Sequence, residues 1–308
     1  MNFASLLNAM PGAVAQGLIW GIMAIGVYIT YKVLDLADLT VDGTMATGGA
    51  VCVMMLLNGR SLWLALLCAV LAGMLAGLVT GIFHTAMGIP AILAGILTQL
   101  SLYSINLAIM DFKANQGINV TKYTLLVSQR NVRQLAPQNP IFITLIAAAL
   151  LIGVLYWFFG TELGSSLRAT GANAAMSRAQ GINTDYAKIL GLMISNGIVA
   201  LASALLSHYQ GFVDVNMGRG AIVIGLAAVI ISEVLFGRLF KNFALKLTGV
   251  AIGAVIYYIV IQIVLWLGLN TNLLKLLSAL IVAVFLAIPY WKAKLSTRFG
   301  RKGGGVHA

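Results

Sequence analysis

Residues 61–83, SLWLALLCAVLAGMLAGLVTGIF, contain no charged side chain over their whole length. A helix needs about 20 apolar residues to cross a lipid bilayer, and runs of this length recur from end to end of the chain. The 308 residues are 60% hydrophobic and 9% charged, against about 25% charged in an average soluble domain. We therefore predict an all-α, polytopic membrane protein with about 8–10 transmembrane helices. The nine candidate spans are 14–34, 39–59, 61–83, 90–110, 141–160, 189–208, 219–237, 247–269 and 273–291.

The formal net charge of +11 comes from Lys and Arg side chains that stand mostly between the apolar runs. The positive-inside bias explains this placement, so we do not expect a nucleic acid as partner. The densest basic cluster forms a tail at 292–308, which we predict to be cytoplasmic and which could contact anionic lipid. Counting spans back from the tail places 238–246 and 161–188 in the cytoplasm as well. The same count places 111–139 outside, despite its four basic side chains.

One of the predicted spans is weaker than the others. The segment 39–59 begins with polar residues, and a break in it would change the side on which the N-terminus lies. Its sequence VDGTMATGGAV, from Val41, is similar to VDVNMGRGAIV, from Val213, at one constant offset. Many transporters contain internal repeats whose interrupted helices meet near the middle of the membrane. We therefore predict interrupted helices and an internal repeat, although chance could also produce this similarity.

The sequence argues against several enzyme classes. It contains no Gly-x-x-x-x-Gly-Lys-Ser/Thr loop for nucleotide phosphates, so we do not expect the chain to hydrolyse ATP. The three histidines are too scattered for a metal site, and no pair of catalytic residues has a convincing spacing. Cys52 and Cys68 lie within apolar runs and are expected to behave as buried apolar side chains. The N-terminus lacks the basic region of a cleaved signal peptide, so we expect it to be retained as the first span.

The most informative polar segment is 161–188, TELGSSLRATGANAAMSRAQGINTDYAK. We predict short helices here, broken at Gly164, Gly171 and Gly181. Small residues allow another surface to approach closely, and the Arg and Asn side chains offer polar contacts around it. The segment therefore has the character of a docking surface, with a solvated loop as the alternative interpretation.

The same segment resembles the cytoplasmic coupling segment of ABC-importer permeases of the branched-chain amino acid and ribose type. The resemblance extends to 36–51, 211–230 and the last span, and so covers nearly the whole chain as one permease domain, 1–308. It is carried by the order Gly-x-x-x-Arg-Ala-x-Gly-x-Asn at 164–173 and by the Gly-Ile-Asn that follows at 181–183. The residues that the resemblance implies for contact with an ATPase are Arg168, Gly171, Asn173, Ala175, Arg178, Gly181, Ile182 and Asn183.

This resemblance implies a permease subunit in a bacterial cytoplasmic (inner) membrane. Two copies would form the pathway, cytoplasmic ATPase subunits would bind ATP and Mg²⁺, and an extracytoplasmic binding protein would deliver the solute; no cofactor is expected in this chain. In 38–43 the family's usual Asn-Phe-Ala-x-Gly run is replaced by Asp-Leu-Thr-Val-Asp-Gly, which resembles permeases of the tryptophan and tyrosine type. An aromatic or branched-chain amino acid is therefore the first expectation for the solute, while a nucleoside or a sugar remains open.

Polar groups within the spans are candidates for the solute pathway, because ionisable side chains in a membrane are costly and often functional. Asp42 has an alternative role as a cap for the helix that opens at Gly43 or Thr44, and Glu233 as an interfacial group. The uncharged members could instead bond neighbouring helices. An ion-gradient-driven carrier, in which Asp42 and Glu233 carry the ion, is the alternative to an ABC permease. The pathway candidates are Asp42, Thr44, Thr98, Gln99, Asn106, Asn196 and Glu233.

Overall fold

The computed structural model describes residues 3–120, 123, 125–133, 138–237, 239–268, 273, 276, 278–285 and 287. In this part of the chain, seven helices are long and apolar enough to cross a membrane. The first, α1, continues directly into a π-helical turn, η1 (Ile29–Val33). The seven are α1 (Phe3–Tyr28), α2 (Thr40–Leu57), α3 (Leu62–Thr85), α4 (Ala91–Ile109), α5 (Pro140–Gly160), α8 (Thr184–Gln210) and α10 (Phe243–Trp266).

The remaining elements are short. Helices α6 (Glu162–Ala172) and α7 (Ala174–Ala179) connect α5 to α8, and α9 (Ala221–Phe236) is apolar but shorter than a full span. A 3-10 turn, η2 (Gln129–Asn131), precedes α5. Strands β1 (Asn115–Gly117) and β2 (Phe212–Asp214) pair antiparallel, with Gln116 opposite Val213. The structure thus confirms an all-α polytopic architecture with very little sheet.

The interruption lies in a different place from the one that the sequence suggested. The segment 39–59 forms α2, an unbroken helix, because its small polar residues pack against other helices rather than breaking the backbone. The segment 219–237 is instead the shortened one, since the chain before α9 runs through β2 and a turn. The predicted span 273–291 falls largely outside the described residues, as does the basic tail 292–308.

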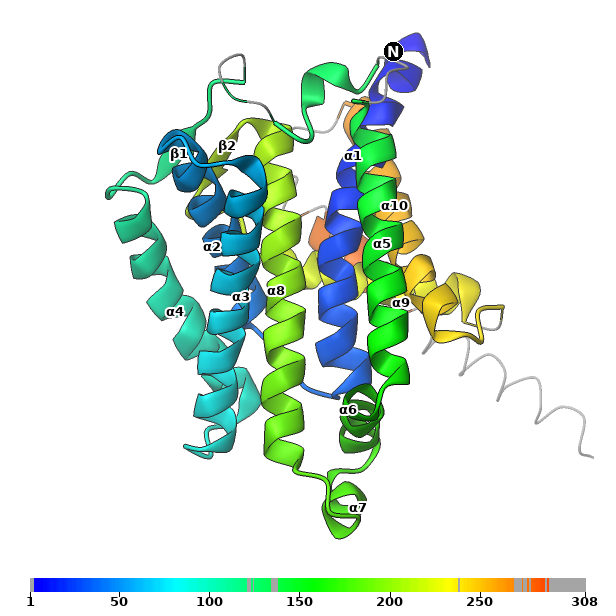
Figure 1. Cartoon of the computed structure of the whole chain (residues 1–308). Coiled ribbons are helices and arrows are strands. Elements are labelled where there is room, and N and C mark those ends of the chain that lie inside the picture. Colours follow the sequence, from blue (N-terminus) through cyan, green and yellow to red (C-terminus); the bar gives the residue numbers. More distant parts are fainter. Residues whose placement is uncertain are drawn as a thin grey trace, which may run out of the picture.

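The helices give the molecule two distinct ends, which we call the α6–α7 end and the β1–β2 end (Figure 1). Helix α1 begins at the β1–β2 end and descends from there towards α6. Arg168 of α6 and Lys241 and Lys246 near the start of α10 line one cavity, so the basic segments 161–188 and 239–246 share an end. Residues 115–117 lie at the opposite end as β1. This arrangement agrees with the sidedness inferred from the basic residues.

The core is built on close approach between α8 and its neighbours α2 and α3. A methyl group added at Gly48 of α2 would stand 2.4 Å from the Ala200 carbonyl oxygen of α8, and one at Gly73 of α3 would stand 2.4 Å from the Asn196 carbonyl oxygen. Small residues allow helix backbones to pack this tightly in a membrane protein, where dispersion contacts replace the hydrophobic effect. In contrast, α5 exposes large apolar side chains such as Leu150 and Trp157.

Candidate functional site

Two helices begin beside each other at the level of Asp42. Asp42 lies in the first turn of α2, and its carboxylate accepts hydrogen bonds from the backbone N–H groups of Gly220 (2.9 Å) and Ile222 (3.0 Å) at the start of α9. The unpaired N–H groups and positive dipole end of α9 are thus satisfied by an acidic side chain from another helix. Asp42 therefore caps α9, and not its own helix at Gly43 or Thr44.

A second buried carboxylate, which the sequence analysis did not select, lies just before α2. Asp38 is 3% exposed; it accepts one hydrogen bond from the Thr40 N–H (2.9 Å) and another from the Asn196 side-chain amide (2.7 Å). The Asn196 side-chain carbonyl in turn accepts from the Thr44 hydroxyl (2.7 Å). This network joins α8 to both the start of α2 and the segment that precedes it. The Asp-Leu-Thr motif at 38–40, an Asx turn before a helix, is the signal that could have identified Asp38.

A chain of hydroxyl groups continues the polar network towards α3 and α4. The Thr40 and Thr80 hydroxyls lie 2.7 Å apart, and the Thr80 hydroxyl donates to that of Thr98 (2.9 Å). Asn106 donates to the Gly43 carbonyl at 3.4 Å, and the backbone of Gln99 packs against Gly43. Of the uncharged pathway candidates, Thr44, Thr98, Asn106 and Asn196 are all buried between helices. In one copy of the chain these four side chains therefore bond helix to helix.

Glu233 is placed away from this network. It lies in the last turns of α9 and pairs with Lys32 of η1 at 2.8 Å, and both side chains are substantially exposed. It is near the α6–α7 end, which corresponds to the interfacial alternative for this residue. The structure therefore does not bring Glu233 together with Asp42, although both were pathway candidates.

The segment 161–188 folds as two short helices whose ends are fixed by side-chain caps. The Thr161 hydroxyl accepts from the Gly164 N–H (3.4 Å) at the start of α6, and the Asn173 side-chain oxygen accepts from the Met176 N–H (3.0 Å) at the start of α7. The Asn183 side chain accepts from the N–H groups of Asp185 and Tyr186 at the start of α8. Asn, Ser and Thr favour these positions because their oxygens satisfy the unpaired N–H groups of a first turn.

The predicted breaks in this segment need correction. Gly164 and Gly171 lie within α6, and the actual breaks are at Asn173, with an extended backbone, and at Gly181, with φ of 82°. The two inner glycines are required for close approach instead. A methyl group at Gly164 would stand 2.3 Å from the Phe158 carbonyl oxygen, and one at Gly171 would overlap the Val33 carbonyl oxygen.

The coupling candidates divide into an exposed group and an anchored group. Arg168 donates a hydrogen bond to the Phe159 carbonyl (2.7 Å), and Gly171 packs against Val33 at the end of η1. Ile182 is partly buried, and Arg178 reaches the Thr184 hydroxyl at 3.4 Å while remaining exposed. The exposed members that surround α7 are Asn173, Ala175, Arg178, Gly181 and Asn183.

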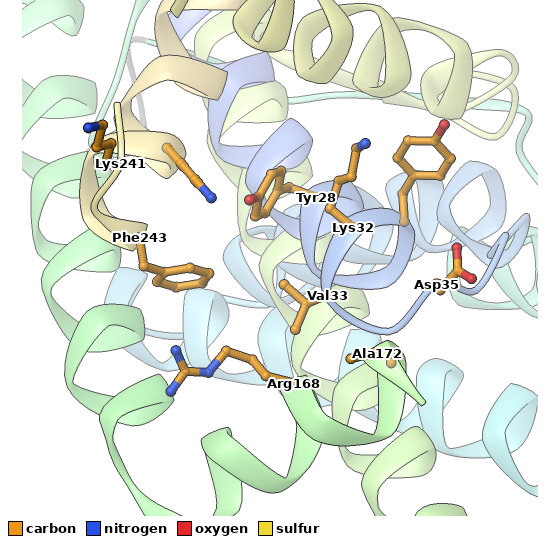
Figure 2. A pocket seen from close by; sticks show the side chains of 11 residues that line it. Tyr28, Lys32, Val33, Asp35, Arg168, Ala172, Lys241 and Phe243 are labelled. Carbon is orange, nitrogen blue, oxygen red and sulfur yellow. The ribbon is translucent and has the colours of Figure 1, made fainter. Parts of the chain in front are cut away.

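A cavity of about 540 Å³ lies beside α6, at the junction with η1 and the start of α10. Figure 2 shows Lys32, Arg168 and Lys241 disposed around it, with Asp35 at one side. Lys246 adds a further cation, so basic groups outnumber the single carboxylate in the lining. The end of η1, α6 and the start of α10 thus meet here, and α6 is also in contact with the core helix α8.

The structure also tests the proposed internal similarity at the level of the backbone. Val41 and the residues after it are helical in α2, whereas the residues at the same offset, from Val213, form β2, a turn and the start of α9. The two segments contact each other directly, because a methyl group at Gly218 would overlap the Asp42 carbonyl oxygen. The sequence analysis missed Arg219, next to this contact, whose position within a Gly-rich stretch before an apolar helix is a signal for an interrupted span.

Comparison with known proteins agrees with this architecture. Residues 10–301 match the family model for the permease component of branched-chain amino acid transport systems. The chain is 40% identical over 281 residues to a tyrosine transport system permease protein of Clostridioides difficile (strain R20291), which covers 91% of each chain. It is 27% identical to a fructose import permease protein of Bifidobacterium longum (strain NCC 2705), over 80% of this chain and 68% of that protein.

A solved structure supports the fold independently. An inward-facing metal-chelate type ABC transporter aligns with 92% of this chain and 85% of its own, with a TM-score of 0.51 at 14% identity. Identity at this level concerns the fold alone. Together with the family match, which spans nearly the whole sequence, it agrees with the bundle of apolar helices. The chain belongs to the family of permease components of branched-chain amino acid transport systems and is a multi-pass protein of the inner membrane.

Proposed function

We propose that the chain forms the membrane pathway of an ABC importer whose solute is an amino acid with an aromatic side chain. The observation that carries this proposal is the 40% identity, over 91% of both chains, to a tyrosine transport system permease protein. The resemblance of residues 38–43 to permeases of the tryptophan and tyrosine type points the same way. A branched-chain amino acid is the neighbouring possibility, since the family model carries that description.

An ATPase subunit would bind the α6–α7 end. The exposed Asn173, Ala175 and Arg178 surround a short helix that projects from the bundle, and α6 behind it is anchored through Gly171 to η1. Movement of α7 would therefore be transmitted to the end of α1. ATP and Mg²⁺ belong to that partner, and this chain itself contributes no catalytic group and no cofactor. A solute-binding protein would dock at the opposite, β1–β2 end.

A second copy of the chain would complete the pathway. Helices α4 and α5 present outer faces with exposed apolar side chains, including Leu100, Ile105 and Leu150. Such faces are suited to contact with lipid or with another apolar helix surface.

A sugar is the second candidate solute, because the chain is also 27% identical to a fructose import permease protein. The alternative of an ion-gradient-driven transporter gains no support from the two residues that would carry the ion. Asp42 is committed to the start of α9, and Glu233 is paired with Lys32 near the bundle end. An ABC importer is therefore the mechanism that we propose.

Uptake by purified components tests this proposal. The chain would be purified from its native membrane in mild detergent, together with any ATPase subunit that accompanies it, and reconstituted into vesicles with its solute-binding protein. We expect ATP-dependent accumulation of labelled tyrosine that excess tryptophan reduces, that excess fructose leaves unchanged and that an ionophore does not abolish. ATP-dependent uptake of fructose in place of tyrosine would show that the solute is a sugar. Accumulation driven by an ion gradient without ATP would show that the chain is an ion-driven carrier.

A further inference from the structure

A cation without an acidic partner lies at the start of α9. Arg219 is exposed in the turn between β2 and α9, and it makes no ion pair with any carboxylate of the described residues. Its guanidinium carbon stands 5.9 Å from the centre of the Tyr103 ring of α4. The nearby Asp42 carboxylate is already bonded to the backbone of Gly220 and Ile222.

The turn that carries Arg219 lies at membrane depth. Asp42, which contacts this turn, is 15 residues before the end of α2 at Leu57, and a helix rises about 1.5 Å per residue, so about 22 Å of α2 separates them. The apolar core of a bilayer is about 30 Å thick. A charged side chain at such a depth is costly and usually faces a pathway or a partner charge. The position of Arg219 therefore needs a functional explanation.

Arg219 also lines a cavity of about 470 Å³ between α1, α9 and α10. The residues that line it include the aromatic Trp20, Tyr257 and Tyr258 and the polar Gln16 and Gln262. Trp20 is 7% exposed, and its indole N–H has no hydrogen-bond partner among the described residues. A buried donor of this kind is costly unless a ligand or water satisfies it.

The cavity lies in the half of the molecule away from the α6–α7 end. Phe243, at the start of α10, lines the cavity beside α6, whereas Tyr257 is 14 residues further along the same helix, or about 21 Å at the usual rise. A solute that enters at the β1–β2 end would therefore meet this cavity before it reaches the α6–α7 end. The volume falls within the range of about 300–1,000 Å³ that is usual for small-molecule sites.

We infer that this cavity is a binding station for an amino acid on the transport pathway, with Arg219 as the group that binds the α-carboxylate. This inference rests on the proposed function and adds the site of recognition. A guanidinium binds a carboxylate through two parallel charge-assisted hydrogen bonds. The aromatic walls match an aromatic side chain, and the amide oxygens of Gln16 and Gln262 can accept hydrogen bonds from its ammonium group. A neutral sugar has no charged group with which the guanidinium could pair.

The first test removes the charge within the complete reconstituted transporter. We expect Arg219→Gln to lower ATP-dependent tyrosine uptake at least about ten-fold, the loss that corresponds to one good charged contact. The matched control, Arg60→Gln, changes an exposed arginine in the turn after α2 and should retain uptake. Basal ATP hydrolysis reports that the complex is assembled. Wild-type uptake by Arg219→Gln would overturn this inference while leaving the proposed function intact.

The second test fills the cavity without altering a charge. If Arg219→Gln loses basal ATP hydrolysis and so fails to assemble, this second test decides whether the cavity lies on the transport pathway. Val223 lines the cavity and is 39% exposed, so Val223→Trp should block uptake while ATP hydrolysis continues. Leu75→Trp adds bulk at a 60% exposed site on α3, a helix that has no part in the proposed contact between copies, and should leave uptake unchanged. Full uptake by Val223→Trp would overturn the inference. A wild-type transporter that takes up no amino acid would instead overturn the proposed function, and this inference with it.

Discussion

The carboxylate of Asp42 accepts a hydrogen bond of 2.9 Å from the backbone N–H of Gly220, which lies 178 residues later in the chain. Ile222 donates to the other oxygen at 3.0 Å. These contacts join the first turn of α2 to the first turn of α9, and they occur where the shortened helix α9 would otherwise leave its N–H groups without partners. The start of α9 is thus held by a residue that belongs to a different helix.

Replacing Asp42 by Asn should destabilise the protein, because the change removes the negative charge that faces the positive end of α9. Hydrogen bonds to a charged group contribute about 1.5–3 kcal/mol each, so we expect a loss of that order in the free energy of unfolding. The measurement is the melting temperature of the purified transporter in detergent. Asp214→Asn is the control, since Asp214 ends strand β2 and accepts its bonds where water can reach them. Equal melting temperatures for Asp42→Asn and the wild type would show that the cap is unimportant.

Replacing Asn196 by Leu should be more damaging. Leu has a similar volume but removes the amide that bonds the buried Asp38 carboxylate, which keeps the bond from the Thr40 N–H, and it removes the acceptor of the Thr44 hydroxyl. Loss of one member of a buried charged network typically costs about 3–5 kcal/mol. We expect little folded protein in the membrane fraction. Ser101→Ala removes an exposed hydroxyl from α4 that bonds only its own helix, and its expression should equal that of the wild type.

The contact between α2 and α8 predicts a large difference between two glycine substitutions. Gly48→Ala forces a methyl group to within 2.4 Å of the Ala200 carbonyl oxygen, so the two backbones must separate. We expect a cost of about 1–3 kcal/mol, measured as a lower melting temperature. Gly153→Ala on α5 meets no atom within 4 Å and should leave the melting temperature unchanged or slightly higher. Similar effects of the two substitutions would contradict the packing described for α2.

The exposed surface of α7 predicts the result of a charge reversal. If Arg178 faces an ATPase subunit, Arg178→Glu should reduce the amount of that subunit that co-purifies and should lower transport, while insertion into the membrane continues. Arg60→Glu reverses a charge in the turn after α2, at the β1–β2 end, and should have no effect on co-purification. Loss of the ATPase subunit from both variants, or from neither, would remove the support for docking at α7.

The ion pair of Glu233 predicts a weak effect. Both Glu233 and Lys32 are substantially exposed, and exposed pairs usually contribute about 0–1 kcal/mol. Glu233→Gln should therefore retain tyrosine uptake and lower the melting temperature by little, and the difference should shrink as salt is added. A complete loss of uptake in this variant, with normal basal ATP hydrolysis, would show instead that Glu233 takes part in the solute pathway.

The sequence by itself determined the architecture, because apolar runs of sufficient length have few alternatives to a membrane helix. It also identified 161–188 as a distinct polar segment and assigned its orientation from basic residues that the structure places at one end. The detailed breaks in that segment were wrong at Gly164 and Gly171, since a glycine can serve close packing as well as a turn. Only the neighbouring backbone at Phe158 and Val33 decides between these two uses.

The tertiary structure decided which polar residues work together. Asp42 and Glu233 were equivalent as ionisable residues in apolar runs, yet one holds the start of α9 and the other pairs with Lys32 near the bundle end. Arg219 drew no attention in the sequence, because its importance depends on a cavity formed by helices far apart along the chain. Periodicity and composition report which residues meet lipid, since that depends on local pattern. Which polar side chains meet one another depends on how the helices pack, and that is a property of the whole fold.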